Sequence, residues 1–404
     1  MKNNWQTKKL GDLCRIEIGK TPYRGNIKYW DTERQTKNVW LSIADLLNTE
    51  GNVVLDSKEY LSDKGAELSK IVRKGTLLAS FKLTLGRLAF AGKELYTNEA
   101  IAALNIKNDN EISKDYLYHY LSYYDWHGAV KGDVKIKGKT LNKEKLKEIE
   151  IFFPKSIFEQ NYIVKKLDKL FAGIEKAKQN AGKNLKNSRE LFESYLQDIF
   201  ANPGEGWEEK SLEEIGKITS SKRIYKKEYV KDGVPFYRIK EIKELAHDKE
   251  ISLELFISKI RYKEIRDVFG VPAEGDVLMT AVGTIGEIYV VKKDEEFYFK
   301  DGNILWFKDF HAIDPYFLKY VLMSFVEQIK KISKGSAYSA LTIEKIEKHH
   351  IFIPKSITEQ KAIVKKLNAL AGETKKLEAI YQKKLADLEE LKKSVLKKAF
   401  SGEL

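Results

Sequence analysis

Hydrophobic residues recur at intervals of three and four along two long stretches of the chain, residues 157–200 and 357–400. This spacing places the apolar side chains on one face of a helix, with Lys and Glu on the remaining faces. In both stretches the pattern continues for about four heptads. The sequence therefore predicts two long amphipathic helices, each with an apolar seam.

Two matching seams in one chain favour pairing as a coiled coil over the alternative, in which each helix lies singly on a domain. The predicted seam residues are Ile163, Leu167, Leu170, Ile174 and Leu191 in the first helix, and Ile363, Leu367, Leu370, Leu377, Leu388 and Leu391 in the second. A compact segment between the helices should bring the end of the first close to the start of the second. The pair is therefore predicted to be antiparallel.

The start of each helix is written twice. Residues 151–170 and 351–370 are identical at 14 of 20 positions, with a constant offset of 200. In each copy a Pro-Lys-Ser is followed by Glu159 or Glu359 three residues beyond the Ser, which is typical of a capping box. A repeat of this length indicates a tandem duplication of a unit of roughly 200 residues.

The segments before each helix show a mixed α/β pattern. In the first segment, strands are predicted at residues 39–43, 53–55, 75–80 and 87–91, and helices at 62–70 and 115–124. The second segment repeats this order with different residues. We expect an α/β (α+β) protein with a pseudo-twofold internal repeat, in which a long antiparallel two-helix coiled coil separates two similar domains. The predicted parts are an α/β domain at 1–150, a helix and linker at 151–206, a second α/β domain at 207–350, and a C-terminal helix at 351–404.

The charge balance suggests a polyanionic partner. Lys and Arg number 72 against 59 Asp and Glu, a net charge of +13, which favours nucleic acid, although a basic surface can also serve solubility. The single cysteine, Cys14, excludes disulfides within the chain and predicts a cytoplasmic protein. The first ten residues lack the apolar core of a signal peptide, and no apolar run approaches the length of a membrane span.

Candidate DNA-binding residues are cations, hydroxyls and aromatics on predicted turns, since Lys and Arg hold phosphates and Arg, Ser and Tyr can reach base edges. In the first domain they are Lys20, Thr21, Tyr23, Arg24, Lys82, Lys135, Lys137 and Lys139, and in the second they are Lys222, Arg223, Tyr225, Lys226, Lys227, Arg238, Lys334, Ser336 and Tyr338. Lys135, Lys137 and Lys139 alternate, so in a strand they would share one face. The alternative for each position is a solvated, charged loop.

No catalytic or metal site emerges from the sequence. Asp314-Pro-Tyr-Phe resembles an adenine methyltransferase motif but lacks its second Pro, and it is typical of a helix start. The six histidines show no metal-ligand spacing. Asp232, Glu241 and Lys243 could form a nuclease cluster, but such a match is common in a chain rich in Glu and Lys.

The duplicated Pro-Lys-Ser-Ile-x-Glu-Gln, followed by Ile-Val-x-Lys-Leu, resembles the specificity subunit of type I restriction–modification systems, and the likeness covers the whole chain. The resemblance implies two target recognition domains on an antiparallel coiled coil and a subunit without catalytic activity. It also implies double-stranded DNA as ligand, two methyltransferase subunits that use S-adenosylmethionine, and restriction subunits that use ATP and Mg. No cofactor is expected on this chain. The alternatives are a coiled-coil scaffold and a standalone DNA-modifying enzyme with unrecognised chemistry.

Overall fold

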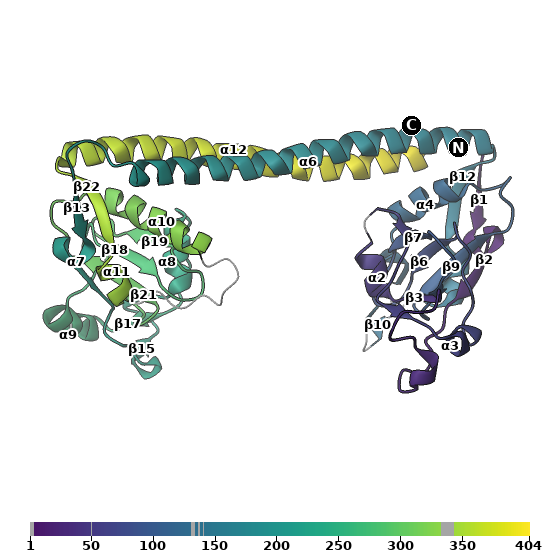
Figure 1. The fold of residues 1–404 in the computed structure, drawn as a ribbon, viewed down its shortest axis with the longest axis horizontal. Coiled ribbons are helices and arrows are strands. Elements are labelled where there is room, and N and C mark those ends of the chain that lie inside the picture. The colour runs from purple at the N-terminus through teal and green to yellow at the C-terminus, as the bar shows by residue number, and fades with distance from the viewer. Residues whose placement is uncertain (1–3, 50, 131–133, 136–137, 140, 333–342) are drawn as a thin grey trace. The chain divides into compact units, whose positions relative to one another are not determined.

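The chain forms two compact units, each with its own hydrophobic cores. The computed structural model describes residues 4–404 except 50, 131–133, 136–137, 140 and 333–342 (Figure 1). The first unit comprises Met1–Ala181 and Lys384–Leu404, and the second comprises Gly182–Lys383. Each unit therefore contains one α/β domain and a part of each long helix. The four domain boundaries inferred from the sequence stay predictions.

The first unit is built from short strands and helices. Its strands are β1 (Trp5–Lys9), β2 (Cys14–Ile18), β3 (Val39–Leu41), β4 (Val53–Val54), β5 (Glu59–Tyr60), β6 (Leu77–Ser80), β7 (Leu88–Ala91), β8 (Tyr96–Thr97), β9 (Ile101–Ile106), β10 (Val134–Lys135), β11 (Gly138–Lys139) and β12 (Glu150–Pro154). Its helices are α1 (Leu10–Leu13), α2 (Ile43–Leu47), α3 (Asp63–Glu67), α4 (Lys114–Tyr123) and α5 (Lys143–Lys147), with 3-10 turns η1 (Ile27–Tyr29) and η2 (Gly128–Val130). The predicted strands and helices of this segment are confirmed, most with shorter bounds.

The second unit has the same kinds of elements. Its strands are β13 (Trp207–Ser211), β14 (Lys217–Thr219), β15 (Tyr229–Val230), β16 (Val234–Tyr237), β17 (Phe256–Ile257), β18 (Val277–Thr280), β19 (Ile288–Val290), β20 (Tyr298–Phe299), β21 (Ile304–Lys308) and β22 (His350–Pro354). Its helices are α7 (Leu212–Ile215), α8 (Ile239–Ala246), α9 (Lys259–Phe269), α10 (Pro315–Ile332) and α11 (Ile343–Glu347), with the 3-10 turn η3 (Lys226–Glu228). The long helices are α6 (Ile157–Ala201) and α12 (Ile357–Phe400).

The sheets of the two units share a common topology, apart from one additional edge strand in each unit, β4 in the first and β15 in the second. The order β2-β9-β6-β7 in the first unit corresponds to β14-β21-β18-β19 in the second, and β5-β3-β8 corresponds to β17-β16-β20. In both smaller sheets the last pair is parallel. The strand that opens each domain pairs with the strand that precedes its long helix, β1 with β12 and β13 with β22. The predicted internal repeat is therefore a repeat of the fold.

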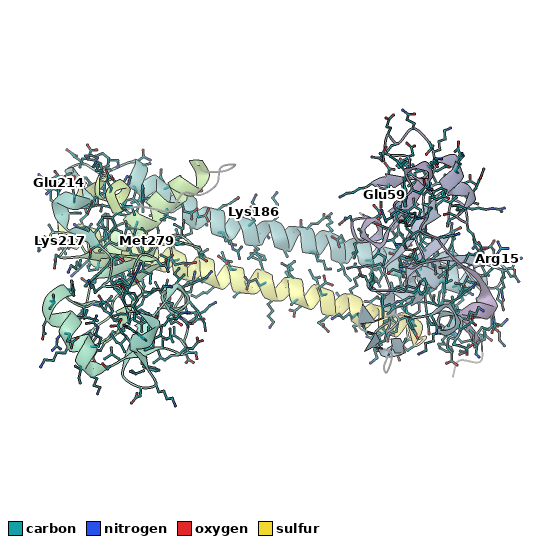
Figure 2. The ribbon with its side chains drawn as sticks, turned by 90° about the horizontal axis from the view of Figure 1, so that it is seen from below. Arg15, Glu59, Lys186, Glu214, Lys217 and Met279 are labelled. Atoms are coloured by element: carbon teal, nitrogen blue, oxygen red, sulfur yellow. The ribbon has the colours of Figure 1, made fainter. Side chains whose placement is uncertain are left out.

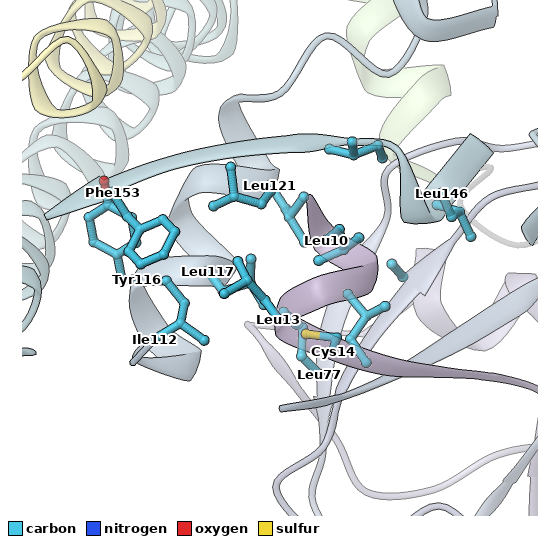
Figure 3. Close-up of a cluster of buried hydrophobic side chains, with 14 of the residues drawn as sticks. Leu10, Leu13, Cys14, Leu77, Ile112, Tyr116, Leu117, Leu121, Leu146 and Phe153 are labelled. Carbon is cyan, nitrogen blue, oxygen red and sulfur yellow. The ribbon is translucent and has the colours of Figure 1, made fainter. Parts of the chain in front are cut away.

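The main core of the first unit lies between the larger sheet and α4 (Figure 3). Leu10, Cys14, Leu77, Tyr116 and Phe153 are all almost fully buried there. The same cluster includes residues from the start of α6 and the end of α12. In the second unit the equivalent cluster takes residues from the end of α6 and the start of α12. The two helices therefore run antiparallel within each unit, as predicted.

The seam between the helices is shifted from the predicted one. Of the predicted residues, Ile163, Leu167, Ile174 and Leu367 are buried and Ile363, Leu370 and Leu388 are half-buried, but four are exposed: Leu170, Leu191, Leu377 and Leu391. At each of these places the covered position lies one residue later, at Phe171, Phe192, Glu378 and Lys392. The heptad pattern is therefore correct at seven of the eleven predicted positions and one residue too early at the other four. A helix of 3.6 residues per turn drifts against a strict heptad, so neighbouring residues compete for the interface.

Two repeated contacts attach each domain to its long helix. The indole of Trp5 donates to Glu159, and that of Trp207 donates to Glu359, both at 3.0 Å. The Glu of the predicted capping box therefore binds a tryptophan. The next residue, Gln160 or Gln360, is fully buried, and its amide donates to the carbonyl of Pro154 or Pro354 at 2.8 and 2.9 Å. These contacts explain why Glu-Gln is duplicated.

Candidate nucleic-acid interface

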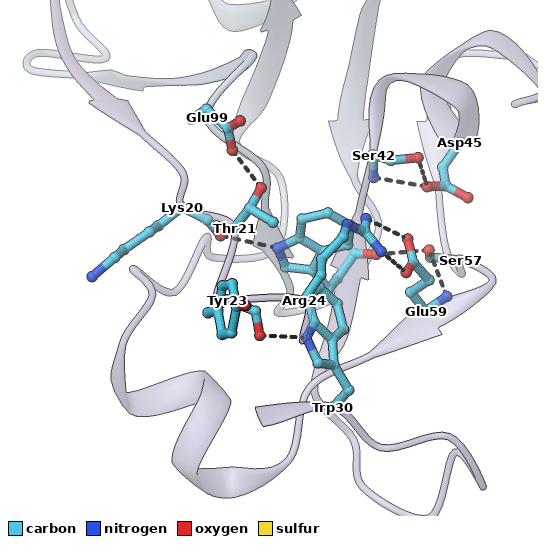
Figure 4. A network of polar contacts seen from close by, with 11 residues as sticks. Lys20, Thr21, Tyr23, Arg24, Trp30, Ser42, Asp45, Ser57, Glu59 and Glu99 are labelled. Carbon is cyan, nitrogen blue, oxygen red and sulfur yellow. Dashed lines mark hydrogen bonds and ion pairs between the residues drawn. The ribbon is translucent and has the colours of Figure 1, made fainter. Parts of the chain in front are cut away.

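The first candidate surface is the turn that follows β2. The backbone of Lys20 is fixed at both groups, because its N–H donates to Thr97 at 2.9 Å and its carbonyl accepts from the Trp40 indole at 3.1 Å. The Lys20 side chain extends away from this network (Figure 4), and Tyr23 is 76% exposed. The turn thus presents one cation and one aromatic ring on a rigid base.

Arg24 lies in the same turn, but its charge is already paired. Its guanidinium forms two hydrogen bonds with Glu59, at 2.5 and 3.1 Å, and lies over the rings of Trp30 and Trp40. The hydrogen bond to Glu59 raises the pKa of Arg24 further above its ordinary value. Bidentate pairing and stacking both restrict an arginine. Arg24 is 56% exposed but is paired within the turn, where it holds the turn in shape beside the exposed Lys20 and Tyr23.

Thr21 is also engaged within the turn. Its hydroxyl donates to the carboxylate of Glu99. Burial raises the pKa of Glu99, but the Thr21 hydrogen bond and nearby cations, including Lys82, bring it below its ordinary value. Glu99 is therefore ionised at neutral pH and accepts the hydrogen bond from the Thr21 hydroxyl.

The corresponding turn of the second unit is built in a similar way. The backbone N–H of Lys222 donates to the Tyr298 hydroxyl at 2.6 Å, and Arg223 pairs with Asp301 at 2.7 Å. Tyr225 is 58% exposed. Lys226 and Lys227 follow on η3 and are exposed. Each unit thus has an arginine held by a carboxylate, beside an exposed tyrosine and at least one exposed lysine.

A hollow of about 610 Å³ lies beside the second turn. Its charged lining residues are three lysines, Lys217, Lys222 and Lys308, and two glutamates, Glu213 and Glu347, and its aromatic residues are Phe269, Tyr298 and Trp306. The Lys222 ammonium lies 4.8 Å from the Phe269 ring, and that of Lys308 lies 4.4 Å from the Trp306 ring. Cations next to aromatic faces suit a polyanion that also carries flat bases.

Arg238 is unsuited to reading bases as it lies here. Its guanidinium pairs with Glu241, which is 2% exposed, at 2.6 Å, and with Glu254 at 2.7 Å. Hydrogen bonds from Lys240 and Arg238 lower the pKa of Glu254 to about 2. Both carboxylates are therefore charged at neutral pH, and contact of Arg238 with DNA would require breaking two ion pairs.

The predicted lysine strand is wrong where the structure describes it. Lys135 and Lys139 lie in two antiparallel strands, with Lys135 opposite Gly138 and Lys139 opposite Val134. They do not share one strand, because the Gly-containing sequence favours a turn over a continuous strand. The remaining predicted residues of these clusters, Lys137, Lys334, Ser336 and Tyr338, lie outside the described residues.

Of the hairpin loops of the larger sheets, the sequence analysis selected only Lys82 in the first loop. In both, a strand-end hydroxyl (Ser80 or Thr280) donates to the carbonyl four residues later. Leu83 in the first loop has a φ of 62° and is 64% exposed, whereas the second loop has Gly283 with a φ of 74°. A leucine in this left-handed region costs about 1 kcal/mol. Leu83, next to Lys82, is thus a strained, exposed apolar residue, and the only signal in the sequence was its alignment with glycine.

Among the residues that the structure describes, no group of three or more His, Cys, Asp or Glu side chains comes together to hold a metal ion. Over the same residues, no helix has both the length and the hydropathy needed to cross a bilayer.

The paired α/β domains on repeated long helices define a class of two-domain DNA-reading subunits, and comparisons with known proteins identify its family. The family described as "Type I restriction modification DNA specificity domain" matches residues 2–182 and again 204–387. The chain belongs to this family. It is a DNA specificity subunit, the non-catalytic component of such a system.

Individual relatives agree with this assignment. The chain is 28% identical over 286 residues to a putative type I restriction enzyme specificity subunit of Haemophilus influenzae, covering 69% of each chain. It is 24% identical over 345 residues to the EcoBI specificity subunit of Escherichia coli, covering 76% of this chain and 69% of the relative.

Solved structures show the same fold. A chain from a study of complex assembly and conformational transition of the type I R-M system matches with a TM-score of 0.79, 18% identity and coverage of 100% of this chain and 99% of the other. The HsdS subunit from Thermoanaerobacter tengcongensis matches with a TM-score of 0.61, 17% identity and coverage of 100% and 98%.

Proposed function

We propose that this chain reads a bipartite double-stranded DNA site, with one half-site contacted by each α/β domain. The observation that carries the proposal is that the two domains share their sheets and helix contacts but differ in their exposed turns. The two domains share one sheet topology and the same Trp–Glu and Gln contacts to their helices. Their exposed turns differ, with Lys20 and Tyr23 in one and Lys222 and Tyr225 in the other. Two domains with a similar fold but different exposed turns suit the recognition of two different half-sites.

Lys20, Lys222, Lys226 and Lys227 form no ion pair among the described residues, so they are available for phosphates. Phosphate contacts position a protein on the duplex, whereas groups at base edges supply specificity. The exposed hydroxyls of Tyr23 and Tyr225 are the candidates for base contact in each turn. The arginines beside them hold the turns in shape.

The test compares paired alanine variants of the two turns, Lys20→Ala with Tyr23→Ala and Lys222→Ala with Tyr225→Ala. Binding is measured over a range of salt concentrations with the methyltransferase subunits present, and methylated bases are mapped in cells. Removing one lysine–phosphate interaction should lower the salt slope by about 0.9. Each pair should alter one half-site and leave the other unchanged.

The matched control is Lys186→Ala, which removes one charge from an exposed position on α6 (Figure 2). This variant should bind like the unchanged chain. Equal weakening by Lys186→Ala would mean that only net charge matters, and an unchanged methylation pattern in both turn variants would contradict the assignment of the turns.

The proposed complex contains two methyltransferase subunits and restriction subunits, which would bind S-adenosylmethionine, ATP and Mg. Support comes from the family and from the fold shared with a chain studied for complex assembly. The internal repeat offers two equivalent docking surfaces, which favours two methyltransferase subunits for each chain. Native mass spectrometry of the assembled complex would count them.

The helices are proposed to set the gap between half-sites. Insertion of one heptad into both α6 and α12 at equivalent positions would lengthen the pair by about 10.5 Å. Methylation mapping should then show a spacer about three base pairs longer, since successive base pairs lie about 3.4 Å apart. Altered half-sites with an unchanged spacer would contradict this role.

A further inference from the structure

Among the described residues, an ion pair joins the long helices in each unit. In the first unit Lys178 of α6 pairs with Glu389 of α12. In the second unit Arg189 of α6 pairs with Glu378 of α12 at 3.1 Å. Both cations belong to α6 and both carboxylates belong to α12.

The internal repeat makes these four positions equivalent in pairs. Residues 178 and 378 are one repeat apart, as are 189 and 389, yet their charges are reversed. Some apolar positions are identical in the two helices and cannot distinguish them, whereas others differ in size, such as Ala181 and Tyr381. The identical pairs are Ile163 and Ile363, Val164 and Val364, Leu167 and Leu367, Leu185 and Leu385, and Leu196 and Leu396.

Pairing of two copies of one helix would therefore be sterically similar at these positions but electrostatically different. In an antiparallel α6–α6 pair of the same register, Lys178 of each copy would meet Arg189 of the other. In an α12–α12 pair, Glu378 would meet Glu389. Like charges at facing positions of a coiled coil disfavour a pairing, and opposite charges favour it.

We propose that the reversed charges at 178, 189, 378 and 389 make α6 and α12 select each other and reject the same helix of a second copy of this chain. The selected partner is the complementary helix, which the linker after Ala201 keeps in the same chain. The ion pairs thus act as a pairing code on a seam whose apolar positions are only partly duplicated.

The burial of the ion pairs supports this role. The side chains of Lys178 and Glu378 are 17% and 25% exposed, so each pair has one partner largely shielded from solvent. The hydrogen bond from Lys178 lowers the pKa of Glu389, which keeps this carboxylate charged at neutral pH. Partial shielding makes such charges less sensitive to salt than fully exposed ones.

The consequence for DNA recognition rests on the proposed function. Pairing of α6 with α12 joins two unlike domains, and hence two unlike half-sites. Pairing of like helices from two copies would join two identical domains and would define a symmetric site. The pairing code would therefore ensure that each specificity subunit reads an asymmetric target.

The experiment uses the full chain in three charge variants. Glu378→Lys with Glu389→Lys makes both helices basic at these positions, and Lys178→Glu with Arg189→Glu makes both acidic. The combination of all four substitutions exchanges the charges and restores opposite pairs. The first two variants should melt about 2–5 °C below the unchanged chain, and the fourfold variant should melt close to it.

The decisive measurement is the mass of mixtures that were unfolded and refolded together. The basic and acidic variants should form a one-to-one dimer, since each α6 then finds an oppositely charged α12 only in the other chain. The unchanged chain mixed with the fourfold variant should give monomers only, because both satisfy their charges internally. Both results are read by native mass spectrometry without DNA, so they do not depend on the proposed recognition.

Two results would overturn the proposal. If the basic and acidic variants remain monomeric when mixed but melt at lower temperature, the ion pairs stabilise the helices without choosing the partner. If both variants melt like the unchanged chain and stay monomeric, the charges have no part in pairing.

Discussion

The junction between α/β domain and long helices is built twice in this protein, and the two copies are filled differently. In the first unit Trp126 is 6% exposed, lies against Gly86, and donates its indole hydrogen to the Leu121 carbonyl at 2.8 Å. Phe171 of α6 packs against the same core. Large aromatic side chains therefore close this junction.

In the second unit small residues occupy the corresponding places. Val326 lies against Gly286, where Trp126 lies against Gly86, and Ala371 is one repeat after Phe171. A cavity of about 1000 Å³ is lined by Val326 and Ala371 together with residues of α6, α8 and α10. The second unit thus has smaller side chains at these two places and a cavity beside them.

The hydrogen bonds that attach each domain to its long helix are the same in the two units, whereas the side chains packed beside them differ. The contacts that attach each domain are the same in both units, with Gln160 accepting from the Ser113 backbone at 2.8 Å and Gln360 accepting from the Asp314 backbone at 2.7 Å. The side chains that fill the junction have diverged. Directional hydrogen bonds fix the orientation of a domain, whereas packing contributes most of the stability.

The largest expected change in the free energy of unfolding follows from removal of the Trp126 side chain. Trp126→Val should lower the free energy of unfolding by about 3 kcal/mol, because a large buried side chain is removed and a cavity remains. Val326→Ala should cost only about 1 kcal/mol, since Val326 already borders a cavity and is smaller. Urea unfolding of the full chain measures both. Equal costs would mean that the two junctions are packed alike.

A smaller effect is expected from exchanging the residue on the long helices. Phe171→Ala should cost about 2 kcal/mol, because the ring is partly buried against the core. Ala371→Phe should instead stabilise the chain by about 1 kcal/mol, since the new ring can enter the cavity. The informative result is whether Ala371→Phe raises or lowers the free energy of unfolding. A lower value would show that the cavity cannot accept the ring.

Much of the fold could be predicted from the sequence because the duplication is explicit. The helices, the antiparallel pairing and the repeated α/β order all follow from spacing and from the offset of 200. Asp314 was interpreted as a helix cap, and its carboxylate accepts from the N–H groups of Tyr316 and Phe317 at 3.0 and 3.1 Å. Local chemistry of this kind can be inferred from the neighbouring residues alone.

The sequence was least informative where residues distant along the chain determine whether a side chain is buried or paired. Leu170 and Leu191 were placed in the seam, but both are exposed, and the partly buried neighbours Phe171 and Phe192 pack against the α/β domains, at His119 and Tyr320. Arg24 and Arg238 stay candidates for DNA contact, but the sequence did not reveal their ion pairs with Glu59 and Glu254, which are distant along the chain. The charged residues of a turn can be identified from the sequence, but whether their side chains are free to contact DNA depends on their partners in the tertiary structure.

The third contrast between the junctions is chemical, and it predicts the smallest effect. In the first unit a ring nitrogen of His119, on α4, lies 3.0 Å from a carboxylate oxygen of Asp168 on α6. In the second unit the Tyr320 hydroxyl donates to Asn368 at 2.6 Å. Only the first contact contains groups that change charge near neutral pH.

Burial lowers the pKa of His119, although Asp168 and Asp115 act in the opposite direction, and Lys392 adds to the lowering. The unfolded chain therefore takes up this proton at higher pH than the folded chain. The contribution of neutral His119 to stability is complete above the unfolded pKa of about 6.5 and is lost as the pH falls below it. His119→Gln should flatten the decrease in unfolding free energy between about pH 7 and pH 5, whereas Tyr320→Phe should leave that decrease unchanged. A decrease in His119→Gln as steep as in the unchanged chain would show that the proton is taken up elsewhere.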